Sequence, residues 1–423
     1  MFFPTSLEPL RLRDFRLQFV ASAASVIGSN VAPIAVAFAI LSLHGSGADL
    51  GIALAARTVS TLLLTPAAGV WGDRLPRHRI MVGSNVGEFV CQALLAGLLL
   101  AHSASISTII VIQAVRGVAD AFFLPATTGL TAELVPSAYR QQANALMSLA
   151  RSTSTIIGPA IAGVLIAATR PAWGLALDAA TFALSAILLM QIRLPAKARM
   201  PVRGGFLADL AVGWREVRTR QWIWVSIVTF MLFQLVVLST FFVLGPVVSE
   251  QDLHGATSWA IIMGAVGIGA LAGDVLALHW RPLRPMFVAT ISAAFSAPVL
   301  LLLAAHVNTV LIAGAAALLG LTFTFPDTLW LSTLQNEVPD DVLARVSAYD
   351  WTGSMVLRPI GYAAAGALAG LVGAGPILVG SAIAVVTVQA AAALVPSIRG
   401  LHRREDTAAL ASAEPERAPS SGA

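Results

Sequence analysis

Charged residues are scarce in this 423-residue chain, in which Asp, Glu, Lys and Arg make up 11% and apolar residues 57%. Soluble domains carry about 25% charged residues. A soluble globule of this length has no means of hiding so much apolar surface, whereas a bilayer accepts apolar side chains on the outside of a protein. The composition therefore predicts an integral membrane protein.

Cysteine is almost absent, and several catalytic motifs are missing. Cys91 is the only cysteine, which excludes an intrachain disulfide and argues against a thiolate metal cluster. The chain has no phosphate-binding Gly-Lys-Ser/Thr loop, so it does not drive transport by ATP hydrolysis. It has no His-Glu-x-x-His or similar ligand cluster, which argues against a membrane protease. We expect no enzyme activity, no metal and no cofactor.

Twelve apolar stretches each reach the roughly 20 residues that a helix needs to cross a bilayer. They lie near residues 17–42, 48–71, 80–101, 106–128, 142–168, 172–192, 222–248, 257–279, 286–305, 309–333, 346–372 and 375–397. The first is too long for the core of a signal peptide and has no small-residue cleavage pattern, so we expect it to be a retained span.

The basic residues gather on one side of these spans. With the N-terminus placed in the cytoplasm, 21 of the 26 Lys and Arg residues lie in inside segments, four lie within spans, and only Arg170 lies outside. This bias predicts a multi-pass protein of the cell (inner) membrane with both termini cytoplasmic. Because the charge follows a membrane face, it also argues against a nucleic-acid partner.

The longest inside connection divides the spans into six and six. We predict an N-terminal six-helix bundle over residues 1–192 and a C-terminal six-helix bundle over 222–398. Residues 193–221 form a linker in which apolar residues recur at helical spacing, which predicts an amphipathic helix on the cytoplasmic surface. Residues 399–423 are rich in Ala, Ser, Pro and charge, which predicts a disordered tail.

Three short motifs recur in the same order at nearly one offset. The pairs are Gly72-Asp73 with Gly273-Asp274, Val135-Pro136 with Val338-Pro339, and Pro159 with Pro359. Parallel halves related by an axis along the membrane normal are typical of secondary transporters, whose substrate site lies between the halves. The predicted fold is an all-α membrane protein with twelve transmembrane helices in two pseudo-twofold-related six-helix bundles.

The segment Gly69-Val-Trp-Gly-Asp73-Arg74-Leu-Pro-Arg77-His-Arg79 resembles the signature loop of the major facilitator superfamily, although Pro76 stands where Gly is usual. The resemblance covers nearly all of residues 10–400. It implies that Gly69, Asp73, Arg74 and Arg77 form a latch, made in one transport state and broken in the other. From the residues alone, a tight, positively charged inside loop is the alternative.

The segment Gly158-Pro159-Ala-Ile-Ala162-Gly163 is similar to the Gly-Pro-x-x-Gly-Gly element of the superfamily's antiporters, with Ala162 in place of one Gly. The resemblance implies that Gly158, Pro159 and Gly163 give a kink and close packing that suppress leak and favour export. An ordinary proline kink is the alternative. Segments 140–146 and 335–347 resemble one efflux branch, which contains macrolide exporters and the enterobactin exporter.

Ionisable side chains inside a membrane are costly and therefore candidates for function. Arg116 and Asp120 lie four residues apart on the fourth span and share a helix face. The resemblance implies that this span lines the central cavity and that an Arg in it is linked to proton coupling. A static ion pair between the two residues is the alternative. Asp327 on the tenth span is the candidate cavity carboxylate of the second half.

The other membrane charges favour structural roles, as partners of one another or as groups that reach solvent. They are Arg57, Glu88, Arg151, Asp178 and Arg358. Asp350 is expected to cap the start of the eleventh span. Four phenylalanines of the seventh span form either an apolar substrate wall or a packing stripe; they are Phe230, Phe233, Phe241 and Phe242.

Together these patterns predict a monomeric, proton-coupled exporter of a lipophilic or amphipathic small molecule, such as a drug, a macrolide or a siderophore. The first span reads Gly28-Ser29-Asn30 where members of the branch often carry an Asp, so coupling rests on Asp120 and Asp327. A nutrient symporter of the same fold and a non-transporting receptor or regulatory membrane protein are the alternatives.

Overall fold

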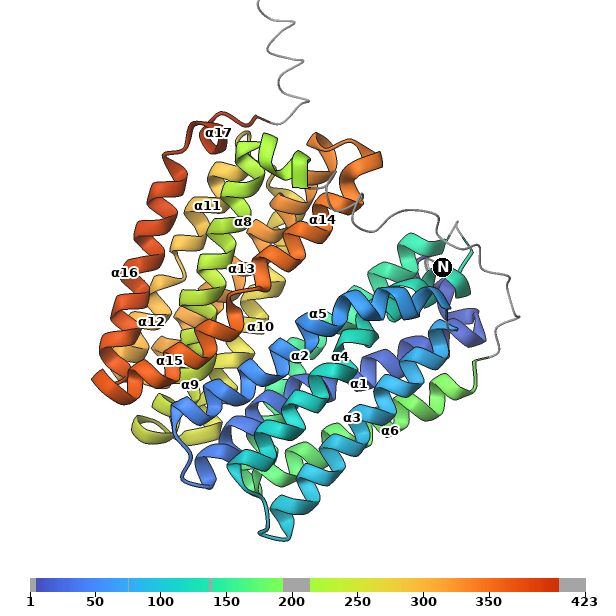
Figure 1. Cartoon of the computed structure of the whole chain (residues 1–423), viewed down its shortest axis with the longest axis vertical. Helices are drawn as coiled ribbons and strands as arrows, with labels where there is room; N and C mark the ends of the chain where they lie inside the picture. Colours follow the sequence, from blue (N-terminus) through green and yellow to red (C-terminus); the bar gives the residue numbers. More distant parts are fainter. Residues whose placement is uncertain (1–4, 75, 137–138, 193–213, 403–423) are drawn as a thin grey trace, which may run out of the picture.

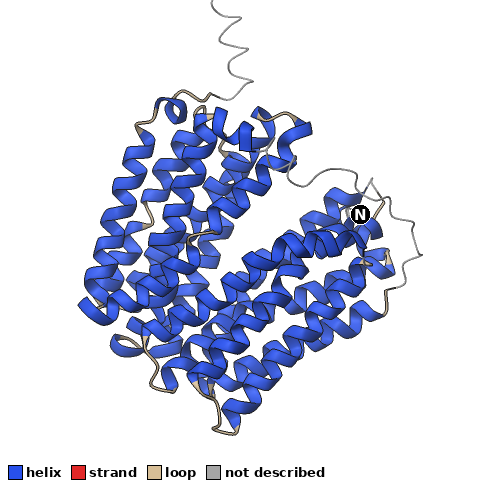
Figure 2. Cartoon of the chain, in the orientation of Figure 1, coloured by secondary structure: helices blue, strands red, loops and turns tan. Residues whose placement is uncertain are grey.

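The computed structural model describes residues 5–74, 76–136, 139–192 and 214–402, and Figures 1 and 2 show helices without strands in these ranges. Within these ranges twelve helical stretches are long and apolar enough to cross a membrane, which confirms the predicted number of spans. The first half, here called the N-half, holds η1 (Thr5–Arg11), α1 (Arg13–Ser42), α2 (Gly47–Arg74), α3 (Arg77–Leu100), α4 (Ile106–Leu134), α5 (Arg140–Ala168) and α6 (Pro171–Met190).

The second half, the C-half, divides three of its spans into shorter helices. Its elements are α8 (Gln221–Phe233), the π-turn η3 (Gln234–Leu238), α9 (Ser239–Asp252), α10 (Gly255–His279), α11 (Pro285–Ala294), α12 (Ala297–Ala304), α13 (Thr309–Glu337), α14 (Asp340–Met355), α15 (Arg358–Val372), α16 (Ala374–Ala393) and α17 (Pro396–Arg399). Breaks in the seventh, ninth and eleventh spans are tolerated where neighbouring helices satisfy the freed backbone.

The helices α4 and α13 show the relation between the halves most clearly. Each is 29 residues long, and each is preceded by a residue whose side chain caps the helix, Ser105 for α4 and Asn308 for α13. Each is followed by a valine in extended conformation, Val135 or Val338. The two helices therefore start and stop at equivalent points of their halves, as the repeated Val-Pro motif predicts.

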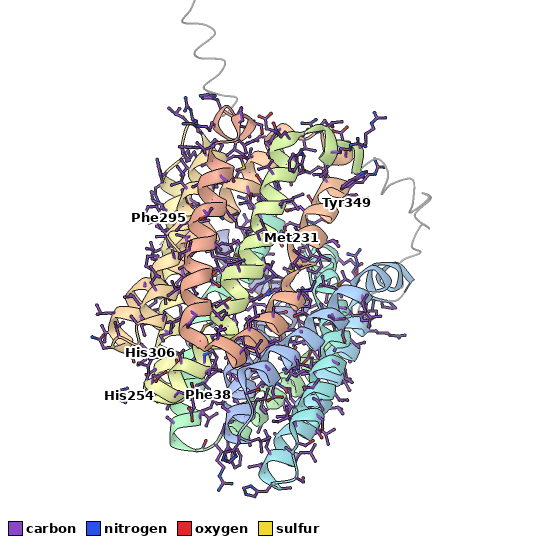
Figure 3. The ribbon with its side chains drawn as sticks, turned by 60° about the vertical axis from the view of Figure 1, so that its left-hand side comes forward. Phe38, Met231, His254, Phe295, His306 and Tyr349 are labelled. Atoms are coloured by element: carbon purple, nitrogen blue, oxygen red, sulfur yellow. The ribbon has the colours of Figure 1, made fainter. Side chains whose placement is uncertain are left out.

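The two halves meet at one end of the molecule and diverge at the other (Figure 1). At the joined end a single apolar core contains Phe38 and Leu50 from the N-half together with Phe241 and Trp259 from the C-half. Toward the opposite end, each half has apolar cores of its own. Figure 3 shows Phe38 at the joined end and Tyr349 toward the open end. The space between the halves therefore opens on the side of the N-terminus.

Close helix packing joins the halves at two places, where α2 packs against α15 and α5 against α10. A Cβ added to Gly51 would collide with the carbonyl oxygen of Tyr362, and one added to Gly267 would lie 2.6 Å from the carbonyl oxygen of Thr155. Small residues let helix backbones approach in this way in membranes.

The outer surface of the bundles is apolar, as a lipid-facing surface requires. The most exposed large side chains on it are Leu63, Val164, Leu278, Val310 and Leu371, each more than 70% exposed. Exposure of such side chains carries no hydrophobic cost when lipid surrounds them, because lipid tails are as apolar as a leucine side chain.

Two sequence predictions fall mostly outside the described residues. Of the linker, only residues 214–221 are described; 214–219 are helical, the rings of Trp214 and Tyr349 lie tilted with their centres 5.8 Å apart, and Val217 is buried in a C-half core. Residues 193–213, with most of the predicted amphipathic helix, and residues 403–423, with most of the predicted disordered tail, lie outside the described ranges.

Candidate functional site

A cavity of about 360 Å³ lies between the halves, and we call it the central cavity. The N-half lines it with Asn30, Arg57 and Asp120, and the C-half with Phe242 and Arg358. A second cavity of about 350 Å³ lies among C-half helices, and Trp351, Met355 and Arg358 line both spaces. Each volume is in the range of small-molecule sites. The two spaces adjoin and together offer room for a mostly apolar ligand.

The N-half contributes an ion pair to the central cavity. Arg57 of α2 donates from Nε to Asp120 Oδ2 of α4 at 2.7 Å, with both side chains half-buried. Thr61, one turn further along α2, donates its hydroxyl to the carbonyl oxygen of Gly117 at 3.0 Å. Gly117 lies against the backbone of Arg57, so α2 and α4 are in close contact at this level. Asp120 therefore lines the cavity while its charge is neutralised by Arg57.

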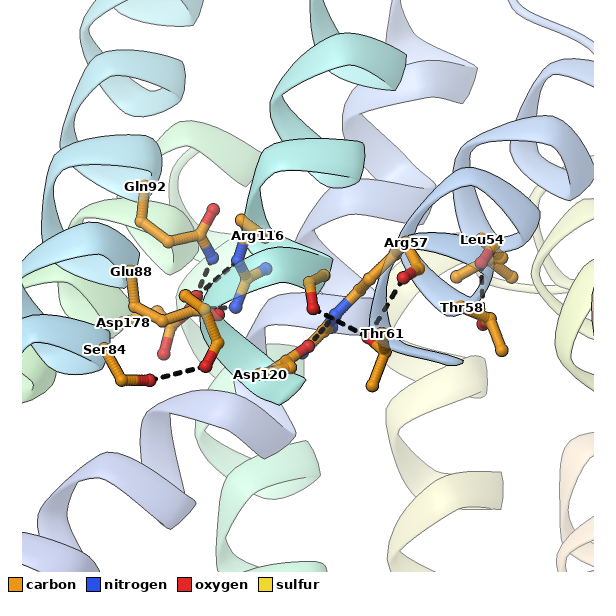
Figure 4. Close-up of polar contacts among 12 residues, drawn as sticks. Leu54, Arg57, Thr58, Thr61, Ser84, Glu88, Gln92, Arg116, Asp120 and Asp178 are labelled. Carbon is orange, nitrogen blue, oxygen red and sulfur yellow. Dashed lines mark hydrogen bonds and ion pairs between the residues drawn. The ribbon is translucent and has the colours of Figure 1, made fainter. Parts of the chain in front are cut away.

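Arg116 and Asp120 do not form the intrahelical ion pair that their spacing allows. Arg116 Nε instead donates to Glu88 Oε2 of α3 at 2.6 Å, and its Nη2 lies 3.4 Å from Asp178 Oδ2 of α6. Gln92 of α3 donates to the same Asp178 oxygen. These four residues form a cluster inside the N-half, drawn in Figure 4, which we call the buried cluster.

The C-half cavity holds two carboxylates. Asp327 of α13 lines it with an exposed side chain. Asp350 accepts hydrogen bonds from Trp330 Nε1 at 2.8 Å and from Ser354 Oγ at 3.3 Å. The prediction that Asp350 caps the start of its span is wrong, because α14 begins at Asp340 and places Asp350 deep within the helix.

Arg358 and Arg151 lie in contrasting places. Arg358 begins α15 in the wall of both cavities, donates from Nε to the Tyr362 hydroxyl at 2.7 Å, and lies 6.0 Å from the centre of the Phe242 ring. Cation–π contacts of this kind stabilise a guanidinium away from water. Arg151 on α5 is exposed. Only the first of the two lines a site.

The four phenylalanines of the seventh span divide between the two predicted roles. Phe230 and Phe233 line the C-half cavity, and Phe242 lines the central cavity. Phe241 is fully buried and packs on Trp259 at 4.9 Å between ring centres. Three of the rings therefore face a cavity and one belongs to the joined end of the halves.

The signature segment between α2 and α3 is tighter than its sequence suggested, since α2 continues to Arg74 and α3 begins at Arg77. The Arg77 guanidinium lies over Gly129 of α4, and its Nε is 3.4 Å from Glu133 Oε1. In this arrangement the Arg77–Glu133 pair is within the N-half. Gly69, Asp73 and Arg74 lie on α2, and the structure does not describe the side-chain surroundings at these three positions.

The Gly-Pro element of α5 lies where three helices meet. Pro159 is buried within α5 and does not divide this helix into two. A Cβ added to Gly158 would collide with Asn30 of α1, and one added to Gly163 would collide with Ala260 of α10. The element therefore brings α5 close both to a cavity-lining helix of its own half and to the opposite half.

Spacing along one chain segment could not reveal most of these partners. Arg57 and Asp120 are 63 positions apart, and Arg116 and Asp178 are 62 apart. The only available signal was the cost of an ionised group in a membrane, which demands a partner without naming one. No feature of the sequence indicated the hydrogen bond between Trp330 and Asp350.

The model of the Major Facilitator Superfamily matches residues 18–362, so the chain belongs to this superfamily. It is 31% identical over 151 residues to the uncharacterized MFS-type transporter YfiS of Bacillus subtilis (36% of this chain, 35% of the relative). Macrolide efflux protein A of Streptococcus pyogenes is 23% identical over 189 residues (44% and 47%). In these matches the chain spans about a third to a half of the relative's length.

Longer matches point to the same superfamily. Multidrug efflux pump Tap of Mycolicibacterium fortuitum is 23% identical over 392 residues, covering 88% of this chain and 93% of the relative. The structure of the nucleoside transporter NupG aligns with a TM-score of 0.68 over 90% of this chain and 98% of that one, at 12% identity, which is a likeness of fold. The predicted family and fold are confirmed, and they are those of a multi-pass membrane transporter.

Proposed function

We propose that the chain is a proton-coupled exporter of a lipophilic or amphipathic small molecule. The observation that carries the proposal is the pair of adjoining cavities, whose walls combine aromatic side chains with the membrane carboxylates Asp120 and Asp327. Apolar walls suit a lipophilic body, and a few polar groups fix its orientation. Similarity to macrolide and multidrug efflux proteins supports export over uptake.

In this proposal two bodies, residues 1–192 and 222–398, rock about the joined end. The basic residues cluster at the open end, so the positive-inside rule makes that end cytoplasmic and both termini cytoplasmic. A compound enters the cavities from the cytoplasm or the inner leaflet. Rocking then closes the open end and opens the joined one, as in alternating access between repeats.

Asp120 and Asp327 are the proposed coupling carboxylates. Protonation of Asp120 would release it from Arg57, which leaves the guanidinium without its counter-ion and favours a different packing of α2 against α4. Arg77 and its neighbours would form the latch at the open end, and the Gly158–Gly163 element would keep the halves sealed during the change. The protein acts as a monomer in this scheme, with protons and one small molecule as its ligands.

Inverted membrane vesicles test this function directly. With an acidic interior, we expect uptake of compounds from a broad lipophilic panel, abolished by a protonophore, and at least tenfold slower for Asp120→Asn. The matched control is Asp252→Asn, an acid near the joined end that lies 3.6 Å from His306 and lines neither cavity. Absence of gradient-driven uptake for the whole panel would contradict the exporter proposal. Unchanged uptake by Asp120→Asn would contradict only the role of Asp120.

A further inference from the structure

The buried cluster contains more acid than base. Glu88 and Asp178 share one guanidinium, that of Arg116, and the side chains of the three residues are 2%, 0% and 0% exposed. If both carboxylates were ionised, the cluster would carry a net charge of −1 out of contact with water. An uncompensated buried charge costs several kcal/mol, and two carboxylates on one site ordinarily share a proton for this reason.

Several polar atoms of the cluster have no hydrogen-bond partner in the structure. They are Glu88 Oε1, Gln92 Oε1, Arg116 Nη1 and Asp178 Oδ1. Buried polar atoms are normally paired. Three of these four atoms are oxygen acceptors, so the cluster has more free acceptors than donors. A proton on one carboxyl would turn one acceptor into a donor and would satisfy part of this surplus of acceptors. Both the net charge and the surplus of acceptors therefore point to a proton bound in the cluster.

In the described parts of the surrounding helices, no other base compensates the extra acid. Around the cluster, α2 supplies Arg57, α3 supplies Cys91, and α4 supplies Asp120, and Arg57 and Asp120 neutralise each other as a pair. The charges of α1 are confined to its first turn, at Arg13, Asp14 and Arg16. On α5, Arg140 lies at the first residue and Arg151 is exposed. The imbalance of one negative charge thus remains in the cluster.

Two contacts connect the cluster to the cavity. Gly28 of α1 covers Asp178, since a Cβ at Gly28 would lie 2.5 Å from Asp178 Oδ1, and Asn30 two residues later lines the central cavity. On α4, Arg116 is one turn from Asp120 of the cavity ion pair, as Figure 4 shows. A shift of α1 or α4 during rocking would therefore change the access of water to the cluster.

We propose that the Glu88–Arg116–Asp178 cluster is a proton-binding site, in which the two carboxylates hold one exchangeable proton. The proton resides on one acid while the other pairs with Arg116. The inference rests on the proposed function only in making this proton part of the transport cycle. The occupancy of the site is a property of the N-half and is measurable without any transported compound.

Infrared spectroscopy of the full chain in lipid measures the proton. We expect the C=O stretching band of a protonated, water-excluded carboxyl at neutral pH, and we expect Asp178→Asn and Glu88→Gln each to remove that same band. The double variant should remove no more than either single one, because each single change leaves one carboxylate against one guanidinium. Transfer to D₂O should shift the band, since the proton is exchangeable.

The matched control is Asp252→Asn, which alters an acid near the joined end, 3.6 Å from His306, and should leave the band intact. Full band intensity in both single variants would overturn the proposal, as would a double variant that loses twice the band of either single one. A band that does not shift in D₂O would overturn exchangeability. If Asp178→Asn does not fold, Glu88→Gln gives the same readout.

The vesicle assay separates this inference from the proposed function. Gradient-driven uptake by the unaltered protein without a shared carboxyl band would overturn the proton site and leave the exporter proposal standing. A shared band in a protein that takes up no compound along the gradient would overturn the exporter proposal alone. A shared band together with gradient-driven uptake supports both.

Discussion

Arg116 heads the largest side chains that are fully buried in the described part of the chain. A guanidinium remains charged in proteins, so its burial in a membrane span is tolerated only with counter-ions. Glu88 and Asp178 provide them from two other helices. The residue therefore ties α3, α4 and α6 together, and its removal affects the N-half more than removal of either acid.

Arg116→Gln should destabilise the protein by about 3–5 kcal/mol near neutral pH, as expected when one partner of a buried ion pair is removed. The deficit should shrink as the pH falls, because protonation neutralises the one carboxylate that is still ionised in the cluster. Thermal unfolding in detergent at pH 8 and pH 5, followed by tryptophan fluorescence, measures both effects. Arg151→Gln, at an exposed position of α5, is the control. An equal deficit at both pH values would contradict the ionic role of Arg116.

At this scale the sequence locates the charged residues within the spans but does not reveal their partners. Arg116 and Asp120 lie four residues apart on α4, yet each pairs with a residue of a different helix. The predicted position of Asp350 at the start of its helix is wrong for a related reason. The apolar run that defines its span begins several residues after Asp340, where the helix itself begins.

At the scale of helices, the contact between α5 and α10 decides how the halves fit together. Gly267 presses on the backbone of Thr155 and on Ile156, and Gly163 presses on Ala260. Packing of small residues substitutes for the hydrophobic effect, which gives little attraction between helices inside a membrane. Both contacts join the Gly-Pro region of α5 to the C-half.

Gly267→Val should separate α5 from α10, because its Cβ alone would lie 2.6 Å from the carbonyl oxygen of Thr155. We expect a loss of about 1–3 kcal/mol in stability, as for other overpacked interfaces, and a clear fall in gradient-driven uptake. The control is Gly264→Val on the same helix, where nothing lies within 4 Å of the added Cβ. The same Tm and uptake in both variants would show that close packing of α5 on α10 is dispensable.

The prolines show where helix boundaries escape sequence reasoning. Pro159 and Pro359 occupy equivalent places in the repeat, but Pro159 lies within an unbroken α5, whereas Pro359 stands in the first turn of α15, after a break in the eleventh span. Proline is tolerated in the first helical turn because no intrahelical bond is needed there. The sequence shows where a proline can interrupt a helix. It does not show which neighbouring groups pair with the backbone carbonyl that loses its hydrogen-bond partner.

At the scale of the whole molecule, the apolar runs and the internal repeat were sufficient to predict the architecture. A bilayer requires each span to be long, apolar and helical, so the twelve apolar runs correspond to twelve helical spans, three of them divided into shorter helices. Which end of the central space is open was not predictable, since it depends on whether the cores of the two halves merge. They merge through Phe38, Leu50, Phe241 and Trp259 at one end.

The orientation of the molecule is open to a labelling test, because Cys91 is the only native thiol. In a Cys91→Ala background, Thr219→Cys should react with a membrane-impermeant maleimide only in inverted vesicles. Ser103→Cys, in the turn between α3 and α4, should react only in intact cells. Both positions are exposed, so each serves as the control for the other. Labelling of Thr219→Cys from outside the cell would contradict the proposed topology.

The central claim is that protons leave the cavities when a compound enters them from the cytoplasmic side. Inverted vesicles that are acidified inside, with a fluorescent acridine dye to report the gradient, measure this exchange directly. The predicted result is a rise in fluorescence when a transported compound is added, with no rise for Asp120→Asn. Accumulation of the compound without any loss of the proton gradient would contradict proton-coupled export.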